Sequence, residues 1–183
     1  KIYAFDAVSG KPKWEFFTAA PVRFSPTAWQ DRAFVVSDDG WLYALSLENG
    51  QVLWKHRGGP SDATVLGNGR ITSKWPARGG PVVLDDIVYY AAGVWPSDGM
   101  YLHALDAGTG KTLWQNDKTG QLEMGQPHGG AMAKSGVSSQ GYLLADAERE
   151  HITRVLSGTA GNKKAAAQLL GLSRRALYRK LDR

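Results

Sequence analysis

One unit of sequence occurs three times, and this repetition limits what the chain can fold into. The copies occupy residues 3–14, 43–54 and 103–114, and in each the final Trp comes eleven positions after the first residue. The first position is Tyr3, Tyr43 or His103, and the successive Trp residues are 40 and 60 positions apart. A period near 40 built from short alternating segments is typical of a β-propeller, in which each repeat forms one blade.

The residues around each copy predict four strands per blade. Segments 26–29 and 33–36 precede the second copy, and segments 81–84 and 87–90 precede the third. The final strands are expected at 52–55 and 111–114. All of these segments are short, rich in β-branched residues and bounded by Gly or Pro, which favours strands over helices. Gly50 and Gly110 suit the hairpin turns, because Gly tolerates positive φ.

The three copies resemble the quinoprotein-type (PQQ-like) β-propeller repeat, whose signature reads Tyr-Ala-Leu-Asp-Ala-x-Thr-Gly-Lys-x-x-Trp. The resemblance covers about residues 1–145 and departs from the signature mainly at His103. In that family the repeat builds the blade, so the resemblance does not by itself imply a bound quinone. We count half a blade at 1–17, full blades at 21–57 and 78–117, and one further strand at 141–146. These segments predict a partial propeller, whose open sheet edge needs a protein partner to cover it.

The chain changes character near Asp146. Residues 1–145 carry 13 Lys and Arg against 13 Asp and Glu, whereas residues 146–183 carry 9 against 4, so the whole net charge of +5 lies in the last segment. From Glu148 onward the apolar residues recur with the 3.6-residue period of a helix. Asn162 is a predicted N-cap for a helix over 163–170, and Ser173 for a third helix. The predicted domains are therefore 1–146, mainly β, and 147–183, an all-α three-helix module.

The second segment resembles the Fis-type helix-turn-helix that ends NtrC-like bacterial regulators. The resemblance rests on Gly161-Asn162-Lys163, on the run from Leu170 to Arg175, and on the run from Leu177 to Leu181. In that family the module recognises specific double-stranded DNA as a dimer, so the resemblance implies a homodimer and a DNA partner. We expect Arg174 to read guanine, with Arg179 one turn onward. Phosphate contacts are expected from Ser173, Arg175, Tyr178, Lys180, Lys163 and Lys164.

The sequence lacks motifs for metal binding, phosphate binding and membrane insertion. The chain has no Cys, and its four His residues lack the spacing of metal ligands. The run 108–112 imitates a phosphate-binding loop, but Leu105 stands where that loop needs a Gly. No apolar stretch is long enough to cross a membrane. We therefore predict no catalytic residue, no cofactor and no metal site.

Two long segments, 58–80 and 115–140, exceed ordinary blade loops, and we interpret them as insertions without a ligand. The polar and aromatic residues that they carry are Asp62, Arg70, Lys74, Trp75, Arg78, Glu123 and His128.

The sequence predicts a noncatalytic protein in which the C-terminal module binds a specific DNA sequence and the blades form a scaffold. The junction near Asp146 indicates a fusion of two segments. Two alternatives stay open: an assembly module whose helices have no function, and a fragment of a quinoprotein dehydrogenase. DNA binding implies the cytoplasm, whereas propellers of this type are typically exported to the periplasm.

Overall fold

The structure is a computed structural model, and it describes residues 1–67, 69–117, 122–125, 132–135, 138–139, 141, 155–156, 159, 161–170 and 177. The chain divides into two compact units, Lys1–Leu143 and Leu144–Arg183. Each unit is considered by itself below. The predicted strand at 141–146 lies outside the described residues, apart from Gly141.

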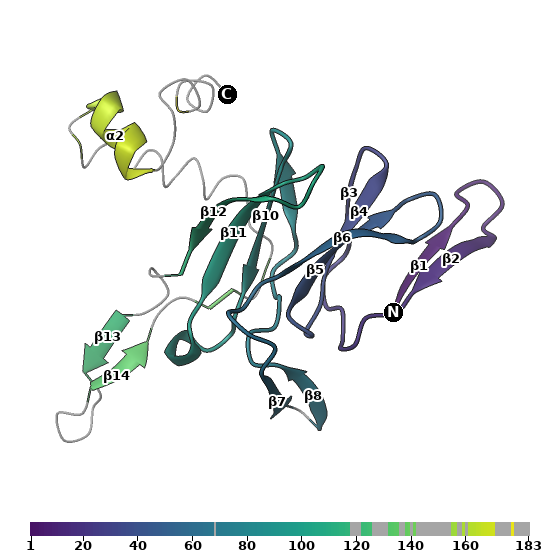
Figure 1. Ribbon diagram of the computed structural model, residues 1–183, viewed down its shortest axis with the longest axis horizontal. Coiled ribbons are helices and arrows are strands. Elements are labelled where there is room, and N and C mark those ends of the chain that lie inside the picture. The colour runs from purple at the N-terminus through teal and green to yellow at the C-terminus, as the bar shows by residue number, and fades with distance from the viewer. Residues whose placement is uncertain are drawn as a thin grey trace. The chain divides into compact units, whose positions relative to one another are not determined.

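Two four-stranded antiparallel sheets form the centre of the first unit (Figure 1). One consists of β3 (Thr27–Trp29), β4 (Arg32–Val36), β5 (Trp41–Ser46) and β6 (Val52–Arg57), in that order. The other consists of β9 (Val82–Leu84), β10 (Ile87–Ala92), β11 (Tyr101–Asp106) and β12 (Thr112–Asn116). We call them blade 1 and blade 2. Both meander as a propeller blade does, which confirms the mainly β prediction with four strands per sheet.

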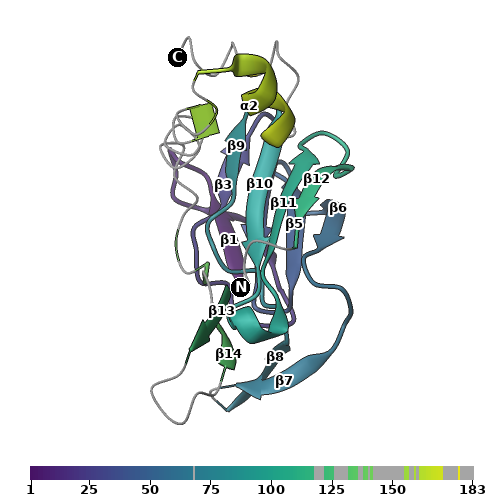
Figure 2. The same cartoon turned by 90° about the vertical axis from the view of Figure 1, so that its left-hand side faces the viewer.

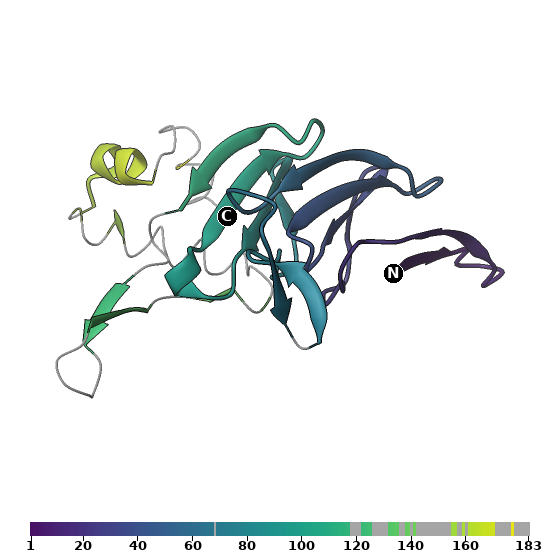
Figure 3. The ribbon, with the colours of Figure 1, turned by 60° about the horizontal axis from the view of Figure 1, so that its bottom comes forward.

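A two-stranded hairpin precedes blade 1. Its strands are β1 (Ile2–Phe5) and β2 (Pro12–Phe16), which carry the first copy of the repeat and correspond to the last two strands of a blade. We call it the half-blade. Figure 3 shows the half-blade, blade 1 and blade 2 following one another in chain order.

The three copies of the repeat have the same register. The Ala that follows the first position pairs with the repeat's Trp, and the pairing then shifts by one residue, which marks a β-bulge. The paired residues are Ala4 and Trp14, Ala44 and Trp54, and Ala104 and Trp114. Identical sequence spacing thus produces the same bulged hairpin three times.

The long segments between and after the blades fold into hairpins, which the sequence analysis did not predict. The segment after blade 1 contains β7 (Thr64–Gly67) and β8 (Arg70–Ser73), which Figure 2 shows beyond one end of the blades. Their insertion explains why the second Trp interval is 60 residues and the first only 40. A short 3₁₀ turn, η1 (Pro96–Asp98), lies between β10 and β11, and β13 (Leu122–Gly125) pairs with β14 (Met132–Ser135).

The main core lies between the two blades. Phe34, Leu42 and Ala44 of blade 1 pack with Val88 and Leu105 of blade 2, and all five are fully buried. Burial of a large aliphatic or aromatic side chain contributes about 1.5–3 kcal/mol. A second cluster joins the half-blade to the other face of blade 1. Blade 1 therefore packs against a neighbour on each of its two faces, blade 2 on one and the half-blade on the other.

The second unit contains α2 (Lys163–Leu169), whose start agrees with the prediction. Ala166 and Ala167 of this helix are buried together with Leu177, and Val155 and Leu156 pack against them. Except for Val155, Leu156 and Leu177, which are helical, the predicted first and third helices lie outside the described residues. Among the described residues, we find no helix of sufficient length and hydrophobicity to span a bilayer.

Candidate functional site

The first turn of α2 carries two of the predicted DNA contacts. Lys163 and Lys164 are both exposed, and Asn162 caps the helix in front of them. The Asn162 side-chain oxygen accepts hydrogen bonds from the backbone N–H groups of Lys164 and Ala165, both at 3.1 Å. An N-cap of this kind satisfies the free amides of a helix start. Because the cap occupies these amides, an anion at this turn would meet the lysine side chains instead.

The other predicted DNA contacts lie outside the described residues. These are Ser173, Arg174, Arg175, Tyr178, Arg179 and Lys180. Leu177, which stands among them in the sequence, is fully buried in the core of the second unit.

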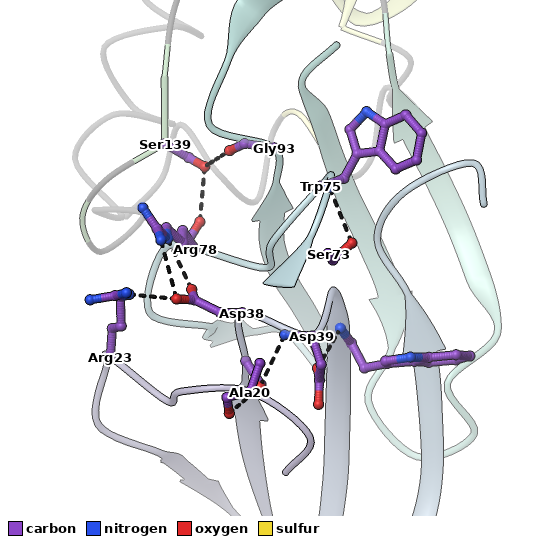
Figure 4. Close-up of polar contacts among 11 residues, drawn as sticks. Ala20, Arg23, Asp38, Asp39, Ser73, Trp75, Arg78, Gly93 and Ser139 are labelled. Carbon is purple, nitrogen blue, oxygen red and sulfur yellow. Dashed lines mark hydrogen bonds and ion pairs between the residues drawn. The ribbon is translucent and has the colours of Figure 1, made fainter. Parts of the chain in front are cut away.

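In the first unit, a buried carboxylate joins three segments (Figure 4). The Asp38 side chain is 1% exposed and accepts hydrogen bonds from two arginines. Arg23 Nε donates at 2.6 Å, while Arg78 donates from Nε at 2.9 Å and from Nη2 at 3.1 Å. The Asp38 carbonyl also accepts from the Ser73 N–H at 2.8 Å. We interpret this group as structural, because its donors and acceptors are used within the chain.

Neighbouring polar contacts extend the same network. The Ser139 hydroxyl donates to the carbonyls of Arg78 at 2.9 Å and Gly93 at 3.3 Å. The Asp39 carboxylate accepts from the Ala19 N–H at 3.1 Å and from the Tyr43 hydroxyl at 2.8 Å. Burial and this acceptor raise the pKa of Tyr43. The loops at this end of the blades are therefore fixed to one another.

The described polar and aromatic residues of the two long segments do not gather into one site. Arg78 is paired with Asp38, and Lys74 lies 3.1 Å from an oxygen of Asp98. The Trp75 indole donates to the Asp98 carbonyl at 2.6 Å. Arg70 lines an open hollow of about 530 Å³, whereas Asp62 lines neither described cavity. The side chain of Glu123 and all of His128 lie outside the described residues.

A pair of histidines between the blades, half-buried His56 and buried His103, was missed by the sequence analysis. His56 of β6 contacts the Tyr90 hydroxyl at 2.6 Å through Nδ1 and the Thr112 hydroxyl at 3.0 Å through Nε2. His103 of β11 lies against His56, with ring centroids 4.9 Å apart, and its Nε2 contacts the Gly58 carbonyl at 2.8 Å. A carbonyl can only accept, so His103 carries its proton on Nε2. The available signal was that His103 replaces the aromatic residue of the repeat.

The surroundings of the pair favour the neutral imidazoles. Burial, with a smaller effect of the His103 ring, lowers the pKa of His56 to about 4. Burial also lowers the pKa of His103, which its contact with the Gly58 carbonyl partly offsets. His103 Nδ1 is buried without a hydrogen-bond partner in the described part of the chain. The pair therefore carries no charge at neutral pH.

Around the histidine pair, the described residues offer neither a metal site nor a cavity of cofactor size. None of the described His, Asp and Glu side chains form a group of three that could hold a metal ion. The cavity beside the histidine pair, lined by Arg57, Tyr101 and Asp117 among others, has a volume of about 210 Å³. Sites for small molecules and cofactors usually measure about 300–1,000 Å³. We therefore derive no catalytic step from this region.

Comparisons with known proteins agree with the two halves of the sequence analysis. The family described as "Bacterial regulatory protein, Fis family" matches residues 143–183. The PQQ-type repeat family described as "Outer membrane protein assembly factor BamB" matches residues 1–74. The predicted resemblance to both families is thus confirmed, with a shorter propeller match than the predicted 1–145. No protein of curated function matches the chain.

Three solved structures share the fold of the first unit at low sequence identity. They are a europium-containing methanol dehydrogenase (20% identity, TM-score 0.51) and the quinohemoprotein alcohol dehydrogenases of Pseudomonas putida HK5 (22%, 0.52) and Comamonas testosteroni (20%, 0.50). They cover 64%, 64% and 71% of this chain, respectively. The chain spans only 21%, 18% and 19% of their lengths. The likeness establishes the blade architecture, and the alcohol chemistry is a property of those enzymes.

Proposed function

We propose that the chain is a noncatalytic protein that binds a specific sequence of double-stranded DNA through residues 147–183. The match of residues 143–183 to Fis-family regulators carries this proposal. The capped α2, with Lys163 and Lys164 exposed at its first turn, supports it. Residues 1–146 then act as a scaffold of propeller blades, and the two segments form a fusion.

Buried Leu177 refines the expected roles on the predicted third helix. Successive helix residues are about 100° apart around the axis. Arg175 and Arg179 then lie about 160° from Leu177, whereas Arg174 lies about 60° away. Arg175 and Arg179 accordingly both lie on the outer side of this helix, and Arg179 is a candidate for the major groove, where an arginine can bond to guanine O6 and N7. Arg174 is the first candidate for base contact, because the first residues of a recognition helix contact base edges.

The remaining six residues serve the phosphate backbone in this proposal. They are Ser173, Arg175, Tyr178, Lys180 and the exposed pair Lys163 and Lys164. Phosphate contacts fix the register of the protein on the duplex and make its affinity depend on salt. A homodimer would place two such modules on the halves of a palindromic site. Because the DNA partner requires it, we assign the chain to the cytoplasm rather than to the periplasm suggested by the propeller repeats.

The test is a selection of duplexes from a random pool by the full chain. Fluorescence anisotropy then compares the selected duplex with a scrambled one at about 50 and 200 mM salt. We expect Arg179→Ala and Arg174→Ala each to lower the preference for the selected duplex by about 10- to 100-fold, as loss of a base contact does. Lys163→Ala should weaken both duplexes equally and reduce the salt slope by about one.

Lys111→Ala is the matched control, because it removes one exposed positive charge from the turn of blade 2. It should leave the affinity for both duplexes unchanged. A pool from which no sequence is enriched, or equal affinity for the selected and the scrambled duplex, would refute sequence-specific binding.

A further inference from the structure

Neighbouring repeats in this chain contact one another through a Trp and a Gly. A Cβ built on Gly50 would lie 2.7 Å from the Trp14 ring, and one built on Gly110 would lie 2.6 Å from the Trp54 ring. Each Trp of one repeat therefore packs directly on the turn of the next, where only a Gly leaves room. The Trp14 indole also donates a hydrogen bond to the Leu47 carbonyl of that turn at 3.0 Å.

The strand beside this turn is buried in blades 1 and 2. In blade 1, Tyr43 is 8% exposed and Leu45 is 0% exposed, and both pack against the half-blade. In blade 2, His103 is 1% exposed and Leu105 is 0% exposed. The Gly turn and the strand before it therefore form one surface, which receives the preceding repeat. We call it the receiving surface.

The half-blade has a receiving surface that is open. Tyr3 and Phe5, which correspond to Tyr43 and Leu45, are 53% and 59% exposed. Gly10 has φ +67°, close to the +74° of Gly50, yet no described atom lies within 4 Å of a Cβ built on it. Figure 1 shows this hairpin at the side of blade 1 that faces away from blade 2.

The complementary group is open in blade 2. Trp114 is the Trp of the third repeat and is 38% exposed, whereas Trp14 and Trp54 are half-buried. Among the described residues, the half-blade thus has a receiving surface with no Trp on it, and Trp114 has no receiving surface against it. Both belong to the first unit.

We propose that Trp114 of one copy packs on the Gly10 turn of a second copy, beside Tyr3 and Phe5. The contact repeats the one that Trp14 makes with Gly50 inside the chain, so the two surfaces already match in shape. The indole N–H would donate to the carbonyl of Ala7, the counterpart of Leu47. A contact between two different surfaces is head-to-tail, and it leads to rings or open chains of copies.

The occupant is a second copy because this chain carries both halves of the contact. Aromatic rings of this size dominate the affinity of protein interfaces. The association uses the blades alone, so it does not depend on the proposed DNA binding.

The test is sedimentation velocity of the full chain from about 1 to 200 μM. We expect the average mass to rise with concentration, and Trp114→Ala to raise the dissociation constant by more than about tenfold, as loss of a central aromatic contact does. Gly10→Asn should raise the dissociation constant by a similar factor. Asn tolerates the left-handed backbone at this position, and its side chain would occupy the space that the Trp ring needs. Circular dichroism verifies that each variant is folded.

Two matched controls remove similar groups elsewhere. Trp95→Ala removes an indole that is 65% exposed, and Gly69→Asn alters a Gly with φ +70° that also has open space around it. Both variants should associate like the unchanged chain. The decisive step mixes the two test variants. Trp114→Ala keeps its receiving surface and Gly10→Asn keeps its Trp, so an equimolar mixture should form a one-to-one dimer and nothing larger.

A chain that stays monomeric at 200 μM overturns the proposal. The receiving surface and Trp114 would then be expected to contact repeats of another protein. Association that survives both variants also overturns it. A mixture that remains monomeric, although the unchanged chain associates, refutes the head-to-tail geometry.

Discussion

The contact between Trp54 and Gly110 predicts a specific loss of stability when a single methyl group is added to the turn. Gly110 has φ +73°, and its Cβ would lie 2.6 Å from Cδ2 and 2.7 Å from Cε3 of Trp54. Carbon atoms pack best at about 3.5–4.0 Å, so the Trp54 ring must move by roughly 1 Å. In Gly110→Ala we expect about 1–2 kcal/mol from the left-handed backbone and a further 1–3 kcal/mol from overpacking.

Gly10→Ala is the matched control for this prediction. Gly10 occupies the same turn position with φ +67°, but its Cβ would meet no described atom within 4 Å. It should therefore lose only the backbone contribution, about 1–2 kcal/mol. The difference between the two variants, about 1–3 kcal/mol, isolates the contact with the Trp ring.

Urea denaturation followed by Trp fluorescence measures both variants. All seven Trp residues lie between positions 14 and 114, so the signal reports on the first unit alone. A concentration near 1 μM keeps self-association out of the measurement. A double variant, Gly110→Ala with Trp54→Leu, should lose less than the sum of its single changes, because the smaller side chain leaves room for the methyl group. Equal losses in Gly110→Ala and Gly10→Ala would refute the reasoning.

Three other predictions concern the remaining polar groups. His56 has a pKa of about 4 in the folded chain and about 6.5 in the unfolded chain. Between these two pH values the unfolded chain binds a proton that the folded chain does not. The free energy of unfolding should therefore fall as the pH drops from 6.5 to 4. The full pKa shift corresponds to about 3 kcal/mol, and we expect about half of that because the His56 ring is partly exposed. Urea denaturation at pH 7 and at pH 4.5 measures this loss of stability. The variant His56→Gln should not show it. Asp38→Ala should lower the free energy of unfolding by about 2 kcal/mol in the same urea assay. This is below the usual value for a broken buried ion pair, because Arg23 is 42% exposed. An unchanged urea midpoint would contradict this prediction. Asn162→Ala should lower the stability of the second unit by about 1 kcal/mol, because two backbone amides lose their hydrogen-bond acceptor. The helical circular dichroism signal should then be lost at a lower temperature on heating.

The sequence predicted the features that arise within about a dozen residues. The hairpins of the repeat followed from the alternation of Leu42, Tyr43 and Ala44 and from the position of Gly50, because strand pairing across a short turn depends on neighbours in the chain. The N-cap role of Asn162 was predicted for the same reason, since a cap acts on amides two and three residues away.

The features that were missed depend on distant partners. Asp38 and Arg78 are 40 positions apart, and His56 and Tyr90 are 34 apart, so neither contact leaves a periodic signal in the sequence. The hairpins β7–β8 and β13–β14 occur once each and follow no repeat, which is why their segments were interpreted as loops. The DNA contacts expected from 173 to 180 stay predictions of the sequence and of the family match.

The first position of the repeat shows why the role of a residue depends on its neighbours. Tyr3, Tyr43 and His103 hold the same place in the same bulged hairpin, yet the first is 53% exposed and the other two are buried. The hairpin is therefore not what buries this side chain, and the repeat packed against it is. The half-blade buries Tyr43, so a further repeat that docks on the half-blade must lower the solvent exposure of Tyr3 in the same way. Protection of Tyr3 at high concentration would therefore be the direct sign of a second copy.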